Sequence, residues 1–242
     1  MIRKMKSRLF GWVLAFVLCF SFSGSKVEAA SLARTSANTS VSGWAYSTQS
    51  GHMGVKTSNY TFDSSTTYNT YSTYLSNGIA LWGTNISMGY TSQSTAKGLI
   101  IASDAASDAT ASTLVVSVDS NGHRTKFTIT IYSVNFLGSY TNVNGRNRTI
   151  AHEIGHAYGL GDISQSSNIM YGSYSTLKQV TTQDIWGMKV VTHQHNHSSS
   201  TTGTYSQLNA SYHNVVCSSC YGIYKQDHSY VNGICSKCGR AQ

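Results

Sequence analysis

The sequence predicts an α+β domain followed by a small, separate C-terminal module. The patterns in the first two thirds of the chain follow the order strand, helix, several strands and a second helix. This order is typical of the α+β class. A stretch rich in serine, threonine and glycine follows at 198–206. Four of the five cysteines lie beyond it, which marks the C-terminal residues as a distinct unit.

Periodicity and turn residues place the individual elements of the larger domain. The apolar side chains at 68, 71, 75, 79 and 82 recur at steps of three and four, which predicts a core-packed helix over 64–82. Strands are predicted at 98–103, 112–118 and 125–136. Asn121-Gly122 between the last two indicates a hairpin, and the alternation of apolar and polar residues from Phe127 to Tyr132 indicates a half-buried strand. A helix is predicted from about 147 to 158.

The first residues have the layout of a secretory signal peptide. Basic residues at 3, 4, 6 and 8 precede the apolar run Leu9–Phe22, and small residues follow around Ala29. The run is shorter than the roughly 20 residues that a membrane span needs. We therefore expect residues 1–29 to be removed, the mature chain to have no membrane span, and the protein to be secreted and extracellular, with attachment to a surface as an alternative. Residues 31–43 are predicted to be a polar lead-in.

The charge of the chain argues against nucleic acid as a partner. The formal net charge is +8, from 17 basic and nine acidic residues. Residues 1–29 hold five of the basic residues and one of the acidic ones, which leaves 12 against 8, or +4, for the mature chain. No cluster of lysine and arginine remains in that part, so neither a nucleic acid nor an anionic membrane surface is expected as a partner.

The run from His152 to Asp162 predicts a catalytic zinc site. Two histidines four residues apart lie on one face of a helix, so His152 and His156 can bind the same ion. Glu153 can face a water molecule in the open fourth position and act as general base. Gly159 can end the helix and turn the chain so that Asp162 becomes the third ligand.

Two further observations bear on this site. Glu153 is the only glutamate after residue 29, which argues that its place in the motif is not accidental and excludes a glutamate further along the chain as third ligand. Aspartate is short, so Asp162 reaches the ion only if the chain approaches closely. The alternative is that Asp162 lies outside the ligand set and that His193 or His195 completes it.

These residues resemble the metzincin signature His-Glu-x-x-His-x-x-Gly-x-x-His with its later Met-turn. The Met-turn match is Asn168-Ile169-Met170-Tyr171-Gly172, in which Met170 would form an apolar floor under the ligands. Asp162 in place of the third histidine is similar to snapalysins, and Met170-Tyr171 is similar to matrixins. The resemblance implies a metzincin-like zinc protease domain over 30–195, with a twisted mixed sheet and an active-site helix. It also implies that the strand near 128–134 is the edge on which substrate pairs, and that Ca²⁺ is a further candidate ion.

The C-terminal cysteines predict a structural zinc site. Cys217 and Cys220 form one C-x-x-C pair and Cys235 and Cys238 a second, the spacing of a zinc ribbon. We place a linker at 196–212 and the zinc-ribbon-like module at 213–242. Two disulfides are the alternative, because exported proteins meet oxidising conditions. His213 and His228 are close enough in sequence to be alternative ligands.

Together these features predict a secreted zinc metalloendopeptidase that acts as a monomer on protein or peptide substrates. One alternative is an extracellular zinc-containing binding or adhesion protein without turnover, although metal binding alone does not need Glu153. Another places the function in the C-terminal module, and a chain truncated near residue 195 would separate that hypothesis from the first.

Overall fold

The computed structural model describes residues 44–138, 142–173, 178–195, 203–218 and 223–242. The predicted signal peptide and the lead-in up to residue 43 lie outside the described residues. Among the described residues, no helix has the length and apolar character needed to cross a membrane.

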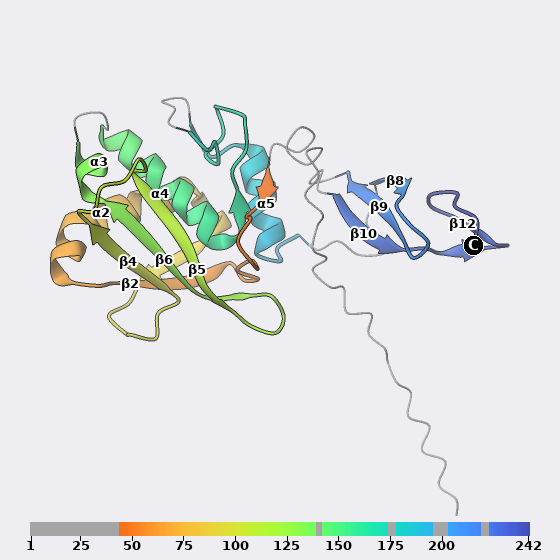
Figure 1. Cartoon of the computed structure of the whole chain (residues 1–242), viewed down its shortest axis with the longest axis horizontal. Coiled ribbons are helices and arrows are strands. Elements are labelled where there is room, and N and C mark those ends of the chain that lie inside the picture. Colours follow the sequence, from red (N-terminus) through yellow and green to blue (C-terminus); the bar gives the residue numbers. More distant parts are fainter. Residues whose placement is uncertain (1–43, 139–141, 174–177, 196–202, 219–222) are drawn as a thin grey trace, which may run out of the picture.

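The larger part of the protein is an α+β unit built on a mixed five-stranded sheet (Figure 1). In spatial order the strands are β3 (Ser87–Tyr90), β2 (Thr57–Phe62), β4 (Gly98–Ser103), β6 (Arg124–Tyr132) and β5 (Ala111–Val118). Strands β3, β2, β4 and β6 are parallel, and β5 runs antiparallel to β6. The predicted α+β class and the predicted strand at 98–103 are confirmed.

The outermost strand on the β6 side of the sheet is β5, and the expectation that residues 128–134 form the edge is wrong. The hairpin turn at Asn121-Gly122 folds the chain back, and Gly122 adopts the positive φ of 76° that this turn requires. Strand β6 therefore pairs with β4 on one side and with β5 on the other. The predicted strand also ends early, because residues Ser133–Leu137 form the short helix α3.

Two long helices, α2 (Ser65–Leu81) and α4 (Val143–Tyr158), pack against each other and against the sheet. Helix α2 begins where its sequence predicts, because the Ser64 side chain accepts a hydrogen bond from the Thr67 N–H. Helix α4 begins at Val143 rather than near residue 147, since Asn142 caps it in the same way through the Gly145 N–H. Helix α4 is therefore about one turn longer at its N-terminus than the sequence pattern predicts.

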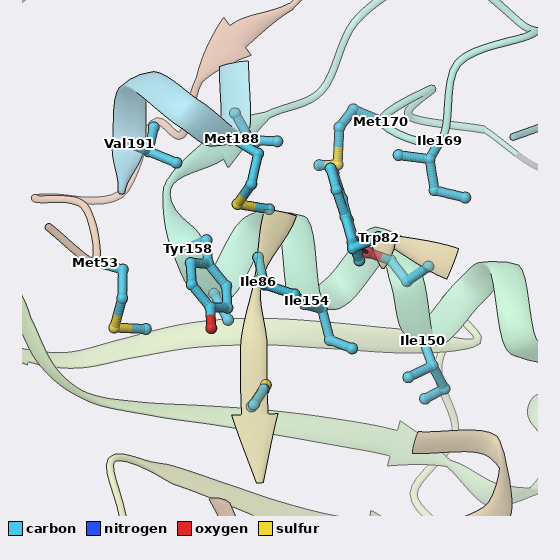
Figure 2. Packing of buried hydrophobic residues seen from close by; sticks show 14 of the residues in the cluster. Met53, Trp82, Ile86, Ile150, Ile154, Tyr158, Ile169, Met170, Met188 and Val191 are labelled. Atoms are coloured by element: carbon cyan, nitrogen blue, oxygen red, sulfur yellow. Dashed lines mark hydrogen bonds between the residues drawn. The ribbon is translucent and has the colours of Figure 1, made fainter. Parts of the chain in front are cut away.

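The sheet and the helices enclose one apolar core. Phe127, Ile129 and Ile131 of β6 are buried, whereas Thr128 and Thr130 between them are only half-buried, so the predicted alternation is confirmed. Figure 2 shows the part of the core near α4, where Met170, Trp82, Ile154 and Tyr158 lie close together.

Several short elements that the sequence pattern did not predict frame the end of α4. Strand β1 (Ala45–Tyr46) pairs with β7 (Leu160–Gly161), and the one-turn helix η1 (Gly83–Asn85) follows α2. Helix α5 (Thr182–Val191) starts at a capping box, in which Thr181 and Asp184 bond to each other's main-chain N–H groups.

The C-terminal residues form a small β unit. Strands β8 (Gly203–Gln207), β9 (Tyr212–Cys217) and β10 (Ile223–Asp227) make one antiparallel sheet, and β11 (Tyr230–Val231) and β12 (Ile234–Cys235) make a hairpin. The predicted linker is therefore too long, because residues 203–207 pair with β9. Of that predicted segment, residues 196–202 lie outside the described residues.

Candidate metal centre

Helix α4 presents His152 and His156 one turn apart. Each imidazole is oriented by a hydrogen bond from its Nδ1: the His152 Nδ1–H donates to the Ile169 carbonyl at 2.9 Å, and the His156 Nδ1–H donates to the Leu160 carbonyl at 2.9 Å. A proton on Nδ1 leaves the Nε2 lone pair of each ring free. Main-chain acceptors are a usual means of fixing metal-binding histidines in this tautomer.

Gly159 ends α4 and turns the chain back toward the histidines. Its φ of 122° is unfavourable for any residue with a Cβ, and its N–H bonds to the carbonyls of Gly155 and His156. The two residues after it pair with β1, which fixes the path of the chain. Asp162 follows directly and is thereby held beside the two imidazoles.

Three ligand atoms converge at this point. Asp162 Oδ1 lies 3.3 Å from His152 Nε2 and 3.4 Å from His156 Nε2. Ligands about 2.0–2.1 Å from a tetrahedral ion are separated by about 3.3 Å. The three side chains therefore form a group that could hold a metal ion. Although burial opposes it, the contacts with the His152 and His156 imidazoles keep the pKa of Asp162 well below its usual value, so the carboxylate is charged.

Glu153 is buried next to this group and its carboxylate is held by the sheet. The Thr113 hydroxyl on β5 lies 2.6 Å from Glu153 Oε2 and 3.0 Å from the Glu153 carbonyl. A cavity of about 380 Å³ lies in front of the carboxylate. It is lined by Ser47, Thr48, Gln49, Ala111, Ser112, Thr113, His152, Glu153, His156, Gly161, Asp162 and Gly172. The arrangement places a buried carboxylate, three potential metal ligands and a cavity together.

Met170 packs under α4, close to where the sequence predicts an apolar floor. Its side chain is fully buried and lies beside Trp82 in Figure 2. Gly155, between the two histidines, makes this packing possible, because a Cβ there would overlap the Met170 sulfur. The Met170 carbonyl also accepts a hydrogen bond from the Ile163 N–H at 2.9 Å, which ties this loop to the segment that carries Asp162.

We predict that Gly155→Ala destabilises the protein by about 1–3 kcal/mol through overpacking. An ordinary helical glycine should respond in the opposite sense, since alanine is the better helix former by about 1 kcal/mol. Denaturant unfolding measures the change. Gly89→Ala in strand β3 is the control for an added methyl group that causes no overlap, because a Cβ at Gly89 meets no atom within 4 Å. An unchanged or higher stability of Gly155→Ala would contradict the packing described.

The two alternative third ligands lie elsewhere. His193 Nε2 is 2.8 Å from His52 Nε2, and His195 Nε2 is 3.3 Å from Cys217 Sγ. The geometry therefore brings Asp162, and neither of these histidines, into the group with His152 and His156.

Two buried charged residues that the sequence pattern did not single out support the centre. Arg124 is fully buried and donates to the main-chain carbonyls of His156 and Ala157 at the end of α4. Burial lowers the pKa of Arg124 to about 10, so it stays charged at neutral pH. Asp184 Oδ2 accepts from the Ile169 N–H at 3.2 Å and so holds the loop before Met170. The Thr-x-x-Asp capping pattern could have revealed Asp184, but no local signal marks Arg124.

A second group that could hold a metal ion lies in the C-terminal unit and consists of His213, His228, Cys235 and Cys238. The two histidine Nδ1 atoms are 3.4 Å apart, and each lies near a sulfur: His213 Nδ1 is 3.8 Å from Cys235 Sγ, and His228 Nδ1 is 3.5 Å from Cys238 Sγ. Tetrahedral zinc ligands have nitrogen–sulfur separations of about 3.6 Å. The Nε2–H groups donate outward, to Gln226 Oε1 and to the Asn209 carbonyl, which leaves both Nδ1 atoms facing the group.

This set differs from the four cysteines predicted from the spacing. It contains Cys235 and Cys238 together with the two histidines left as alternatives. Cys217 points to His195 instead, and Cys220 lies outside the described residues. The three described cysteines form no disulfide. Although burial opposes it, main-chain N–H groups of Cys238 and Lys237 and the His228 side chain lower the pKa of Cys235 to about 5, which favours the thiolate that binds metal.

We predict that His213→Gln and Cys235→Ser each release one metal ion per chain, whereas Cys217→Ser does not. The reason is that only the first two residues belong to the group of four. The measurement is the thiolate-to-cobalt absorption of the cobalt-substituted protein. This absorption should weaken in Cys235→Ser and stay unchanged in Cys217→Ser. Loss of that absorption in Cys217→Ser would instead support the four-cysteine site.

No protein-family model matches the sequence, and no curated protein matches it.

Proposed function

We propose that this protein is a secreted zinc metalloendopeptidase of the metzincin type. The observation that carries the proposal is the convergence of His152, His156 and Asp162 beside a buried glutamate that faces a cavity. Two histidines and a carboxylate leave a fourth position open, as catalytic zinc sites do and closed structural sites do not. The apolar N-terminal segment supports export.

The donor set fits zinc better than it fits calcium or magnesium. Two imidazole nitrogens and one carboxylate oxygen are typical zinc ligands, whereas the harder ions prefer six or more oxygens. Zinc, when bound, would supply the Lewis acidity that polarises a peptide carbonyl and makes water a better acid. The remaining chemistry belongs to the side chains around it.

Glu153 is the general base in this proposal. Its Oε2 accepts a hydrogen bond from the Thr113 hydroxyl. Oε1 is therefore the oxygen that takes a proton from the attacking water. The same carboxyl then donates that proton to the amine that leaves. Thr113 is a positioning residue, because it touches Glu153 and holds the carboxylate in one rotamer against the cavity.

The substrate would bind as an extended segment along β5. Residues two apart in a strand direct their main-chain groups to the same side. The Gln49 side chain bonds the Thr113 carbonyl and the Val115 N–H on the outer side of β5, so this part of the edge is already covered. Ala111 lines the cavity and has main-chain groups on that same side, next to Glu153. We infer that a peptide forms main-chain hydrogen bonds with the N–H and carbonyl of Ala111 and with the N–H of Thr113.

We predict that Thr113→Val lowers kcat by about 10- to 100-fold and changes KM little, since a group that orients the base acts mainly on the chemical step. Thr113→Ser keeps the hydroxyl and should retain most of the activity. Steady-state hydrolysis of a peptide, together with zinc content, gives the measurement. Equal rates for the serine and valine variants would show that the hydroxyl does not position Glu153.

The proposed function is tested by hydrolysis of casein by the chain that begins at Ala30. We expect cleavage that stops after treatment with a zinc chelator and returns when Zn²⁺ is added, but not when Ca²⁺ is added. Zinc bound without any cleavage of casein or of a peptide library would contradict the proposal and favour a binding protein.

A further inference from the structure

A third group of potential ligands lies in the larger domain and consists only of histidines. His52, His123 and His193 come from three segments distant in the sequence, and each offers a ring nitrogen within 4.8 Å of those of the other two. The closest pair is His52 Nε2 and His193 Nε2, at 2.8 Å. The ring centroids are 4.9–5.3 Å apart. None of these residues belongs to the centre that contains Glu153.

The main chain holds each histidine in place. The His52 N–H bonds to the Gly122 carbonyl at 3.1 Å, and the Arg124 N–H bonds to the His52 carbonyl at 2.8 Å, so His52 lies directly beside His123 in the β5–β6 turn. His193 follows the end of α5 with a φ of 56°. A left-handed conformation is uncommon for a residue other than glycine and is found more often where function requires it.

Two neighbours shape the group further. Gly54 leaves room for the His123 ring, because a Cβ at that position would overlap the imidazole. Asp119 Oδ2 lies 3.6 Å from His123 Nδ1, while its Oδ1 accepts from the N–H groups of Asn121 and His123. A carboxylate on one ring nitrogen directs the other nitrogen toward a metal and increases its basicity.

We propose that His52, His123 and His193 form a metal site for a divalent transition-metal ion such as Zn²⁺, separate from the centre at Glu153. Three imidazoles are typical ligands for such an ion, and the exposed position of His193 lets water take the fourth place. The bound ion would tie the segment after β1, the β5–β6 turn and the end of α5 to one another. His52 also lies against Gly159, the residue that ends α4, so the ion would stabilise that corner.

The same geometry has a simpler explanation that the experiment must exclude. Tetrahedral nitrogen ligands are about 3.3 Å apart, and 2.8 Å is also the length of a hydrogen bond between two imidazoles. Metal binding requires the His52–His193 pair to open by about half an ångström. A hydrogen bond requires no metal at all.

The experiment is zinc content of the full mature chain after equilibration in a zinc buffer, compared between wild type and His193→Asn. Asparagine tolerates the left-handed backbone at this position, so the variant should fold. His195→Gln is the matched control, because it removes a histidine two residues away that is outside the group. We expect His193→Asn to bind one ion fewer per chain than wild type and His195→Gln to bind the same number as wild type. Equal content in wild type and His193→Asn would overturn the proposal.

Asp119→Asn provides a second test that does not alter a ligand. Asparagine keeps the oxygen that accepts from the turn N–H groups but loses the charge beside His123. We expect the affinity for one zinc ion to fall about 10- to 100-fold with the other ions unaffected. His123→Asn removes a ligand, and its zinc content is measured beside that of Asp119→Asn. If the zinc affinities of Asp119→Asn and the zinc content of His123→Asn both equal those of wild type, the histidines form only a hydrogen-bonded cluster.

Discussion

Replacing Glu153 with glutamine should abolish peptide hydrolysis while zinc remains bound at His152, His156 and Asp162. Glutamine has nearly the same size and can still accept the hydrogen bond from Thr113, but it cannot take a proton from water. General-base catalysis contributes about 10²- to 10⁴-fold, so kcat/KM should fall by at least that factor. The KM for a peptide should change less, because the main-chain pairing along β5 is preserved.

Hydrolysis rates and zinc content must be measured on the same preparations of Glu153→Gln. Retained zinc with lost activity would separate the role of the carboxylate from that of the ligands. Cleavage by Glu153→Gln at the wild-type rate would refute the proposed mechanism.

Replacing Asp162 with alanine should weaken zinc binding at the centre by several orders of magnitude and remove activity with it. The variant loses one of the three potential ligands and a negative charge that lies 3.3–3.4 Å from both imidazoles. Competition with a chromophoric chelator measures the affinity. Zinc affinity and activity close to wild type would show that another group completes the site.

Asp162→His distinguishes the ligand role from a purely electrostatic one. Asp162 is exposed on one side, but its Cβ and Cγ would lie 3.2 and 3.1 Å from a Cβ built on Gly172, so the side chain packs closely against that glycine. We expect the larger imidazole to restore zinc binding only partly, although histidine is the residue that most metzincins have at this point. Full restoration of affinity would show that the chain can move away from the ion.

The apo protein should also lose stability as the pH falls. Burial opposes it, but the contacts of the carboxylate with the His152 and His156 imidazoles hold the folded-state pKa of Asp162 below its usual value. A group with a depressed pKa stabilises the fold above its unfolded pKa, and the contribution disappears as the pH falls through the folded pKa. Thermal unfolding of metal-free protein should therefore show a smaller loss of stability below pH 4 in Asp162→Asn than in wild type.

The sequence by itself determined the features that depend on neighbouring residues. The period of three and four in α2, the glycine that ends α4, and the Asn-Gly turn between β5 and β6 each reflect main-chain hydrogen bonds or φ values that are set within a few residues. The four-residue step from His152 to His156 is of the same kind. These local rules were sufficient to place His152, His156 and Glu153 on one helix.

Only the tertiary structure decided which distant residues meet. Thr113 reaches Glu153 because β5 is the outer strand, and the order of strands in a sheet depends on pairing across the whole domain. His213 and His228 join Cys235 and Cys238 because β9 and the β11–β12 hairpin come together. The group of three histidines is formed by segments up to 141 residues apart. Residue spacing carries no information about such contacts. They form by packing and by hydrogen bonds between segments that come together only when the chain folds.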